Sequence, residues 1–398
     1  MSALMTTYAP LPVSFTHGIG AELFDSAGKA YLDGLSGIAV TNLGHAHAGV
    51  TEAITRQASE FLHCSNIFRI DAQERAGAAL VERSGMESVF FCNSGAEANE
   101  CAIKIARLHA NHRGIEKPQI VVLEGAFHGR TLATLSAGGN RKIQAGFEPL
   151  VSGFLRAPRN DIDALKSIAA SNRDIAAVFL EPVQGESGIH VLDSDYLQAV
   201  AALCKEQNWL LIFDEVQSGN GRTGSYFYYQ QINVAPDVVT TAKALGNGVP
   251  VGACIARGEA AETFAPGNHG STYGGNPLAC AVAGAVLEAH AQEQWMERAS
   301  PIRSALLDGF AGGLRHGEVV REVRGAGLMI GIELDRSCPE IVALALEQQL
   351  LLNVTAGSTV RLLPPLVMSD AQAKHYGQCL AAVVDSWAGE RETLAGAA

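Results

Sequence analysis

The sequence has few positive charges and no paired-cysteine motif, and both shortages exclude classes of function. Its 29 Lys and Arg residues are outnumbered by 41 Asp and Glu residues, so the formal net charge is -12. An acidic surface of this kind does not favour nucleic acid or an anionic membrane as a partner. No CxxC pair occurs among the eight cysteines, so neither a zinc site nor a disulfide framework is indicated.

Targeting and membrane-spanning patterns are also missing. No hydrophobic run approaches the length of a membrane helix. The first 28 residues contain no Lys or Arg, so they lack the basic start of a signal peptide and the arginines of a transit peptide. We therefore expect a cytoplasmic protein whose cysteines are reduced and mostly buried.

Hydrophobic residues, by contrast, are plentiful and regularly placed. They make up 47% of the 398 residues, which suits a large core and about two to three domains. From about residue 86, short apolar runs such as SVFFC, IAAVFLEP and WLLIFDE alternate with helical segments. Strands that are apolar on both faces and separated by helices indicate an α/β fold, with a mostly parallel sheet covered by helices.

Three segments are expected along the chain. Residues 1–40 carry short extended pieces and are predicted to form an N-terminal arm or small subdomain. Residues 41–297 contain the strand–helix alternation and are predicted to form the large domain. Residues 298–398 mix helices and strands and are predicted to form a smaller α+β domain. No repeat or low-complexity linker separates these segments.

Two polar features follow predicted strands, where the ligands of open α/β sheets bind. In FFCNSGAEANE, a strand runs into a small-residue turn at Gly95 and Ala96, and a helix then begins. Backbone N–H groups at such a helix start bind phosphate, although ordinary strand–helix turns have the same composition. In WLLIFDE, Asp214 ends an apolar strand. It could pair with a cationic ring nitrogen, or it could simply cap a helix or lie on the surface.

A lysine and an aromatic residue stand at two further strand ends. Lys243 follows the apolar run DVVTTA, and burial there would leave a neutral amine that attacks aldehydes. A lone lysine more often extends to the surface. In EGAFHGRT, Phe127 could stack on a planar ring, and Arg130 could bind a carboxylate through two hydrogen bonds. The alternatives are a core phenylalanine and a surface arginine.

The order of these features is more specific than any one of them. A phosphate-binding turn, a stacking aromatic, a strand-end Asp and a lysine about 30 residues later match what pyridoxal 5'-phosphate requires. Lys243 would hold this cofactor covalently. Asp214 would keep the ring nitrogen protonated, so that the ring withdraws electrons from the substrate.

Several longer motifs occur in order along the chain, namely NSGAEANE, FHGRT, EPVQGE, LLIFDEVQSGNGRTG, TTAKALGNGVPVGA, HGSTYGGNPLA and RLLPPL. Together they resemble the class III, ornithine-type aminotransferases, from Tyr8 to about Pro365. Within this class, YAP, GIAVTNLGHAH, FHGR and GNGRTG are most similar to acetylornithine aminotransferases. The resemblance implies fold type I of the pyridoxal-phosphate-dependent transferases, with a large domain built on a mostly parallel sheet and a smaller α+β domain.

The resemblance also implies the cofactor contacts. Lys243 would carry the cofactor, and Asp214 would pair with its ring nitrogen. The remaining contacts would surround the ring and the phosphate: Gly95 and Ala96 at the phosphate, Phe127 and Val216 on the two ring faces, Gln217 near the phenolic oxygen, and Glu215 and Thr272. Glu181 would lie behind them. Thr272 would reach the neighbouring subunit's site, so the resemblance implies a homodimer with shared active sites.

Five substrate contacts follow from the same resemblance: Tyr8, Arg130, Glu186, Ser271 and Arg361. Arg130, helped by Tyr8, would hold the substrate carboxylate, and Ser271 would lie near the neighbouring site. Glu186 would neutralise Arg361 while an amine with one carboxylate reacts. It would then free Arg361 for the α-carboxylate of glutamate or 2-oxoglutarate. Two arginines, one of them reversibly masked, let one pocket accept both substrates.

The implied activity is transfer of the terminal amino group of N2-acetyl-L-ornithine to 2-oxoglutarate, giving N-acetylglutamate 5-semialdehyde and L-glutamate. The same chemistry on ornithine, succinyl-diaminopimelate, 4-aminobutyrate or a polyamine is the nearest alternative. An aminomutase on the same fold would need no dicarboxylate, so Glu186 and Arg361 disfavour it. A non-catalytic sensor fused to a DNA-binding segment is disfavoured because no basic segment is present.

Two details lie outside the main pattern. In SGNGRTG, Asn220 stands where the resembling aminotransferases lead us to expect a bulkier residue. In GHAH, His45 and His47 could suggest a metal site, but two histidines without a third ligand are weak support. We expect no metal.

Overall fold

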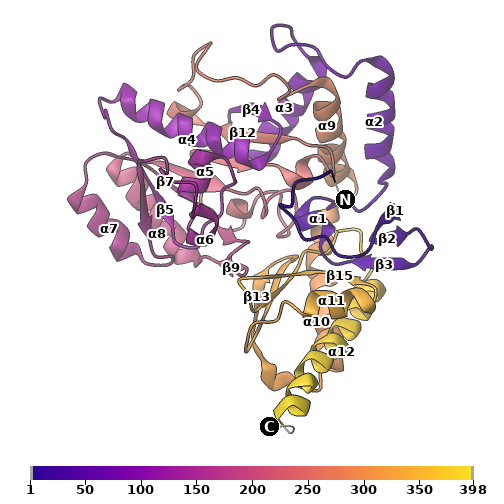
Figure 1. The fold of residues 1–398 in the computed structure, drawn as a ribbon. Helices are drawn as coiled ribbons and strands as arrows, with labels where there is room; N and C mark the ends of the chain where they lie inside the picture. The colour runs from indigo at the N-terminus through magenta and orange to yellow at the C-terminus, as the bar shows by residue number, and fades with distance from the viewer. Residues whose placement is uncertain (1–2, 396–398) are drawn as a thin grey trace.

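The computed structural model describes residues 3–395, and a seven-stranded sheet lies at the centre of its larger part (Figure 1). The strand order is β4-β12-β11-β10-β7-β5-β6. The bounds are β4 Ser88–Cys92, β5 Gln119–Leu123, β6 Phe154–Ala157, β7 Ile175–Leu180, β10 Leu210–Asp214, β11 Val238–Thr241 and β12 Gly252–Ala256. Only β12 runs antiparallel to its neighbours in this sheet. The predicted α/β class with a mostly parallel sheet is confirmed.

Helices cover both faces of this sheet, which explains why its strands are apolar throughout. Along β5, Val121 and Leu123 join a core with α3, α8 and α9, whereas Ile120 and Val122 join a core with α4. All of these strand residues are fully buried. The helix bounds are α3 Asp71–Ser84, α4 Gly95–His112, α5 Leu132–Ala137, α7 Ile162–Ser171, α8 Ser194–Gln207 and α9 Pro277–Gln292.

A smaller antiparallel sheet lies below the large one in Figure 1, beside the helices drawn in orange and yellow. Its order is β13-β14-β17-β16. Its bounds, with those of its helices, are β13 Val320–Ala326, β14 Met329–Leu334, β16 Asn353–Thr355, β17 Thr359–Leu362, α10 Ala299–Gly313, α11 Ile341–Glu347 and α12 Asp370–Ala395. Together these elements bury a second core, which includes Tyr376 and Trp387.

The N-terminal strands join this second part of the molecule. β1 (Phe15–Ile19), β2 (Glu22–Asp25) and β3 (Ala30–Asp33) form a sheet whose fourth strand is β15 (Leu350–Leu351). Ala21 and Leu32 belong to the smaller core. The beginning and the end of the chain therefore pack together, and the boundaries near residues 40 and 297 stay a prediction.

The remaining elements connect these layers. They are α1 Ser36–Ala39, α2 Ala48–Glu60, α6 Arg141–Gln144, β8 Val183–Gln184, β9 His190–Val191 and short 3-10 helices at Tyr228–Gln230, Lys243–Leu245, Gly258–Ala260, Trp295–Arg298 and Gly317–Val319. No helix within the described residues 3–395 is long and apolar enough to span a bilayer.

Candidate active site

A cavity of about 440 Å³ opens at the carboxyl ends of the parallel strands, where open α/β sheets bind ligands. Much of its lining comes from segments that follow strands. The lining residues include Ser94, Gly95 and Ala96 after β4, Phe127 to Arg130 after β5, Glu181 after β7, Asp214, Val216 and Gln217 at the end of β10, and Ala242 and Lys243 after β11. The sheet thus brings together residues that are far apart in the sequence.

Lys243 projects from the segment that follows β11. Its φ of +48° is a left-handed conformation, which is uncommon for residues other than glycine. The side chain lies in the interior, with part of its surface open to the cavity. Burial lowers the pKa of its amine to about 8, although the nearby Glu186 carboxylate opposes this effect. A substantial fraction of the amine is therefore neutral, and able to act as a nucleophile, at mildly alkaline pH.

Asp214 is held by three groups at the end of β10. Asn99 Nδ2 donates to its Oδ2 at 2.7 Å, and His128 Nδ1 lies 2.8 Å from the same oxygen. Val216 N donates to Oδ1 at 3.0 Å. Thr240 donates to Asn99 Oδ1 at 2.6 Å and so orients the amide. This carboxylate has one fixed direction in the cavity.

The start of α4 supplies backbone donors to the cavity. The Ser94 side chain caps the helix by accepting from Glu97 N at 3.2 Å. No hydrogen bond from the N–H groups of Gly95 or Ala96 occurs among the described residues. A Cβ atom on Gly95 would come within 2.7 Å of Val216 Cγ1, so only glycine fits there. A helix N-terminus of this kind is suited to an anion.

Glu181 and Gln217 add polar groups to the same wall. Glu181 Oε1 accepts from Phe127 N at 2.8 Å, and Oε2 accepts from Gly185 N at 3.2 Å. Burial, reinforced by the charge of Asp214, raises the pKa of Glu181 to about 8. Gln217 Oε1 is buried without a hydrogen-bond partner among the described residues. A bound molecule could satisfy that oxygen.

A salt bridge joins the large and small parts of the molecule beside Lys243. Glu186 lies in the turn between β8 and β9, and Arg361 lies on β17. Arg361 Nη1 and Glu186 Oε1 are 2.6 Å apart, with side-chain exposures of 1% and 37%. Burial opposes ionisation of Glu186, but Arg361 outweighs it and lowers the pKa of this carboxyl. Asn353 Oδ1 also accepts from Arg361 Nε at 3.1 Å.

Comparisons with known proteins agree with this arrangement. A family model described as aminotransferase class-III matches residues 4–384. The chain belongs to the class-III aminotransferases. It is 51% identical to an acetylornithine aminotransferase of Nitrosomonas europaea over 94% of this chain and 95% of the relative, and 47% identical to one of Methanocaldococcus jannaschii over 91% and 90%.

Solved structures of aminotransferases have the same fold. The ornithine aminotransferase of Toxoplasma gondii superposes with a TM-score of 0.93 at 32% identity, over 98% of this chain and 94% of that chain. The acetylornithine aminotransferase of Elizabethkingia anophelis gives a TM-score of 0.86 at 33% identity, over 96% of each chain. The predicted family and fold type are therefore confirmed.

Two residues in the aminotransferase cavity were missed by sequence reasoning. His128 and Asn99 both contact Asp214, and the His128 ring also stacks on Phe179 at 3.9 Å. His128 stands inside the quoted FHGRT motif, between the two residues that were assigned roles. Asn99 lies one helical turn after Gly95 on α4. Their positions beside the predicted phosphate and ring contacts were the available signal.

Several predicted residues lie away from the single-chain cavity. Tyr8 is 89% exposed and does not line it, whereas Arg130 does and lies over the Phe127 ring at 5.8 Å. Glu215 turns away and accepts from Tyr228 N at 2.7 Å and Tyr229 N at 3.0 Å. These bonds indicate that Glu215 holds the following loop rather than a ligand.

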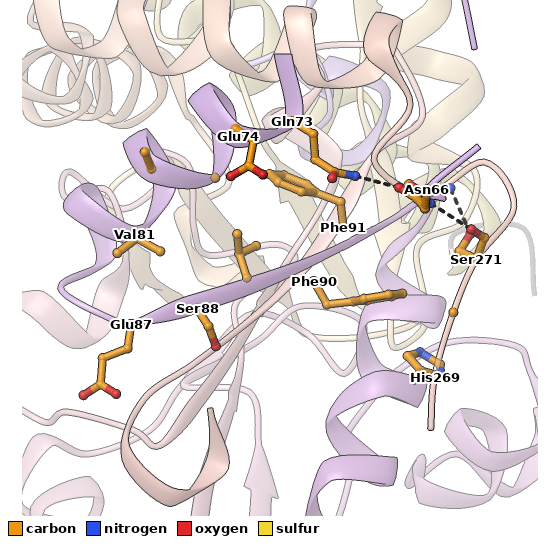
Figure 2. Close-up of a pocket in the computed structure, with 15 residues that line it drawn as sticks. Asn66, Gln73, Glu74, Val81, Glu87, Ser88, Phe90, Phe91, His269 and Ser271 are labelled. Carbon is orange, nitrogen blue, oxygen red and sulfur yellow. Dashed lines mark hydrogen bonds between the residues drawn. The ribbon is translucent and has the colours of Figure 1, made fainter. Parts of the chain in front are cut away.

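Ser271 lines a separate surface hollow of about 670 Å³ (Figure 2). Asn66 donates to its backbone oxygen at 3.1 Å, as Figure 2 marks. Thr272 lines a neighbouring hollow with Phe90 and Asn93. The predicted roles of Ser271 and Thr272 thus lie outside their own chain's cavity, and they stay predictions about a neighbouring subunit.

Each of the two GHAH histidines lies beside a carboxylate. His45 Nε2 lies 2.8 Å from Asp33 Oδ2, and His47 Nε2 lies 3.4 Å from Glu293 Oε1. Within residues 3–395 no group of three or more His, Cys, Asp or Glu side chains is arranged to hold a metal ion.

Proposed function

We propose that this aminotransferase moves the terminal amino group of N2-acetyl-L-ornithine to 2-oxoglutarate, giving N-acetylglutamate 5-semialdehyde and L-glutamate. The observation that carries the chemistry is that Lys243 and Asp214, from the ends of neighbouring strands, line one cavity, where burial lowers the pKa of the lysine amine to about 8. The identity of the donor is supported by the relatives named acetylornithine aminotransferases, at 43% to 51% identity.

The cavity residues fit pyridoxal 5'-phosphate. Lys243 would hold it, the Gly95 and Ala96 N–H groups would bind its phosphate, and Asp214 would face its ring nitrogen. The unpartnered Gln217 oxygen and the unbonded N–H groups at the start of α4 both suit a bound group. When bound, this cofactor supplies an electron sink for the substrate carbon that carries the amino group.

The chain's own residues position the substrate and move protons. When it is not bonded to the cofactor, the Lys243 amine would accept a proton from the substrate carbon that carries the amino group and would later donate that proton back, a task suited to a pKa near working pH. Asp214 holds a proton at the ring nitrogen, and Asn99 and His128 fix the direction of that carboxylate. Arg130 at the cavity wall binds the substrate's α-carboxylate.

The Glu186–Arg361 pair accounts for the use of two different substrates. With the pair closed at 2.6 Å, the neutralised Arg361 suits an amine donor that has one carboxylate. When glutamate or 2-oxoglutarate enters, its α-carboxylate replaces Glu186 on Arg361, and Glu186 turns toward solvent. Its 37% exposure gives it room to do so. An aminomutase would have no use for such an exchange.

We further propose a homodimer in which each chain completes the other's site. Large apolar side chains are exposed on the single chain, among them Phe61, Leu62, Ile67, Phe68 and Tyr273. Exposed apolar groups of this size mark an interaction surface. Thr272 lies beside Tyr273 and outside its own cavity. A cytoplasmic location also belongs to the proposal, since eight free thiols suit a reducing compartment.

The test is an absorbance titration of the purified protein loaded with pyridoxal 5'-phosphate. N2-acetylornithine, ornithine, succinyl-diaminopimelate, a polyamine and 4-aminobutyrate are added separately, without any 2-oxo acid. Loss of the visible band with N2-acetylornithine at the lowest concentration, and its return with 2-oxoglutarate, is expected. Preference for another amine would reassign the donor. Turnover without any 2-oxo acid would instead support an aminomutase.

A further inference from the structure

Asn220 is a buried polar residue in the turn that follows β10. It is 1% exposed, and its φ of +56° is a left-handed conformation that asparagine tolerates better than most residues. It also departs from the bulkier residue that the resembling aminotransferases lead us to expect. A buried amide in an apolar surrounding is unfavourable unless its hydrogen bonds are made, so its partners define its role.

Those partners lie next to the catalytic lysine. Asn220 Nδ2 donates to Thr241 Oγ1 at 2.8 Å and to the backbone oxygen of Ala242 at 3.2 Å. Tyr226 donates its hydroxyl to Asn220 Oδ1 at 2.9 Å, which fixes the orientation of the amide. Both donor hydrogens and the acceptor are thus used. Two of the three bonds go to the pair of residues that immediately precedes Lys243.

The bonded segment needs such support. The Ala242 oxygen belongs to the peptide unit that leads into Lys243, whose φ of +48° is uncommon for a lysine. Strained conformations of this kind persist only where surrounding contacts over-determine them. On the far side of the lysine, Asn247 accepts from Leu43 N at 3.0 Å and donates to Gly44 O at 3.1 Å. The segment is therefore clamped before and after Lys243.

Asn220 is itself anchored across the molecule. Its backbone oxygen accepts from Asn42 Nδ2 at 2.8 Å. Arg222, which is fully buried, donates to Asn42 Oδ1 and to the backbone oxygen of Pro364. Contacts from the N-terminal segment and from the segment after β17 thus meet at the turn that carries Asn220.

We propose that Asn220 is a positioning residue for Lys243. By holding the Ala242 carbonyl, it fixes the peptide unit from which the lysine side chain departs, and so fixes where the amine lies relative to the reacting carbon. The proposal rests on the proposed function, since it assigns Lys243 the proton transfer. Asn220 itself does not line the cavity.

The test replaces Asn220 with leucine, which has a similar size and makes none of the three bonds. The matched control is Asn233→Leu, because Asn233 also has a positive φ, of +52°, but is exposed and has no side-chain bond to the lysine segment. Both variants place a leucine at a similar positive φ. Far-UV circular dichroism and the unfolding midpoint report whether each folds.

We expect Asn220→Leu to lower kcat by about tenfold to a hundredfold, as small misplacements of catalytic groups do. The KM for 2-oxoglutarate should stay within about twofold, because Arg361 and Glu186 are untouched. The pH at which the visible band of the lysine-bound cofactor changes should also shift, since the amine's surroundings change. Asn233→Leu should match the wild type in all three. An unchanged kcat and an unchanged band titration in a folded Asn220→Leu protein would overturn the proposal.

If Asn220→Leu does not fold, Tyr226→Phe decides, because it removes only the hydroxyl that orients the Asn220 amide. A smaller fall in kcat and a shifted band titration support the proposal, and the absence of both overturns it. The wild-type titration with amine and 2-oxoglutarate separates the two levels of inference. If the visible band of the wild type responds to amine and 2-oxoglutarate as expected and the variants match the wild type, only the role of Asn220 is refuted. If the wild-type band does not respond, the proposed function is refuted.

Discussion

Asp214 and Arg130 line the same cavity but are held in opposite ways. Every contact that orients Asp214 comes from the folded chain, through Asn99, His128 and Val216 at 2.7 to 3.0 Å. Arg130 is exposed, and among the described residues its guanidinium has only the Phe127 ring beside it. The floor of the cavity at Asp214 is thus fixed by contacts within one chain, whereas the rim at Arg130, where we propose that substrate binds, lacks such contacts among the described residues.

This difference has a physical basis. A buried carboxylate needs hydrogen-bond partners in the folded state, because water cannot reach it. An arginine at an opening can stay hydrated until a carboxylate replaces the water. A group that must keep one direction throughout the reaction is therefore built into the sheet. A group that must release its substrate is left at the surface.

The largest loss of turnover should come from replacing Lys243, on the floor of the cavity. Lys243→Ala should lower turnover by roughly 10⁴-fold or more, because both the attachment point and the proton carrier are lost. Steady-state turnover of the favoured amine with 2-oxoglutarate measures this. Lys205→Ala, an exposed lysine on α8, is the control and should be unaffected. Normal turnover by Lys243→Ala would remove the basis of the proposed mechanism.

The same lysine predicts how stability depends on pH in the cofactor-free protein. Its folded-state pKa of about 8 lies below 10.5, so the unfolded chain binds more protons between these values. The penalty for burying the charged amine is therefore full below about pH 8 and disappears as the pH rises to 10.5. Lys243→Met should stabilise the protein by about 3 kcal/mol at neutral pH, with a gain that shrinks above pH 8. Urea unfolding at several pH values tests this, and a gain that grows with pH would contradict it.

The next largest effect should come from His128. His128→Phe keeps a ring against Phe179 but removes the contact with Asp214. We expect kcat/KM to fall by about tenfold to a hundredfold, because the carboxylate loses its fixed direction. His109→Phe is the control. His109 lies on the same helix as Asn99 and contacts the carboxylate of Glu259, but it does not line the cavity. Equal losses in both variants would mean that general stability, and not Asp214, is affected.

His128 also illustrates what the sequence could and could not predict. Lys243, Asp214 and Gly95 each follow an apolar strand, so their position at one edge of the sheet followed from local pattern alone. The contact of His128 with Asp214 spans 86 residues, and that of Asn99 spans 115. Such pairs depend on strand order, which the alternation of strands and helices does not specify. The pairing of β3 with β15 likewise joins segments that local sequence pattern does not relate.

The next prediction concerns Glu186, which we propose masks the charge of Arg361. Glu186→Gln leaves Arg361 without its neutralising charge, so glutamate and 2-oxoglutarate should bind about tenfold more tightly, and N2-acetylornithine should gain nothing. KM values for both half-reactions measure this. Asp163→Asn, which removes an exposed salt bridge with Lys166, is the control and should leave both values unchanged. Equal changes for the mono- and dicarboxylate substrates would argue against a masking role.

The smallest expected effect comes from an experiment that asks whether Thr272 completes the cavity of a second chain. Lys243→Ala and Thr272→Ala chains carrying different tags are co-produced, at a cofactor concentration where each variant alone is inactive. If Thr272 serves the partner's cavity, half of the randomly paired dimers contain one intact site, and about a quarter of wild-type activity should return. Lys243→Ala mixed with Asp214→Ala is the control, because both residues line one chain's cavity and no intact site can form. Recovery of activity in the first mixture alone would show that Thr272 of one chain completes the cavity of the other. Recovery in neither mixture would mean that Thr272 acts within its own chain and does not cross to a second chain's cavity.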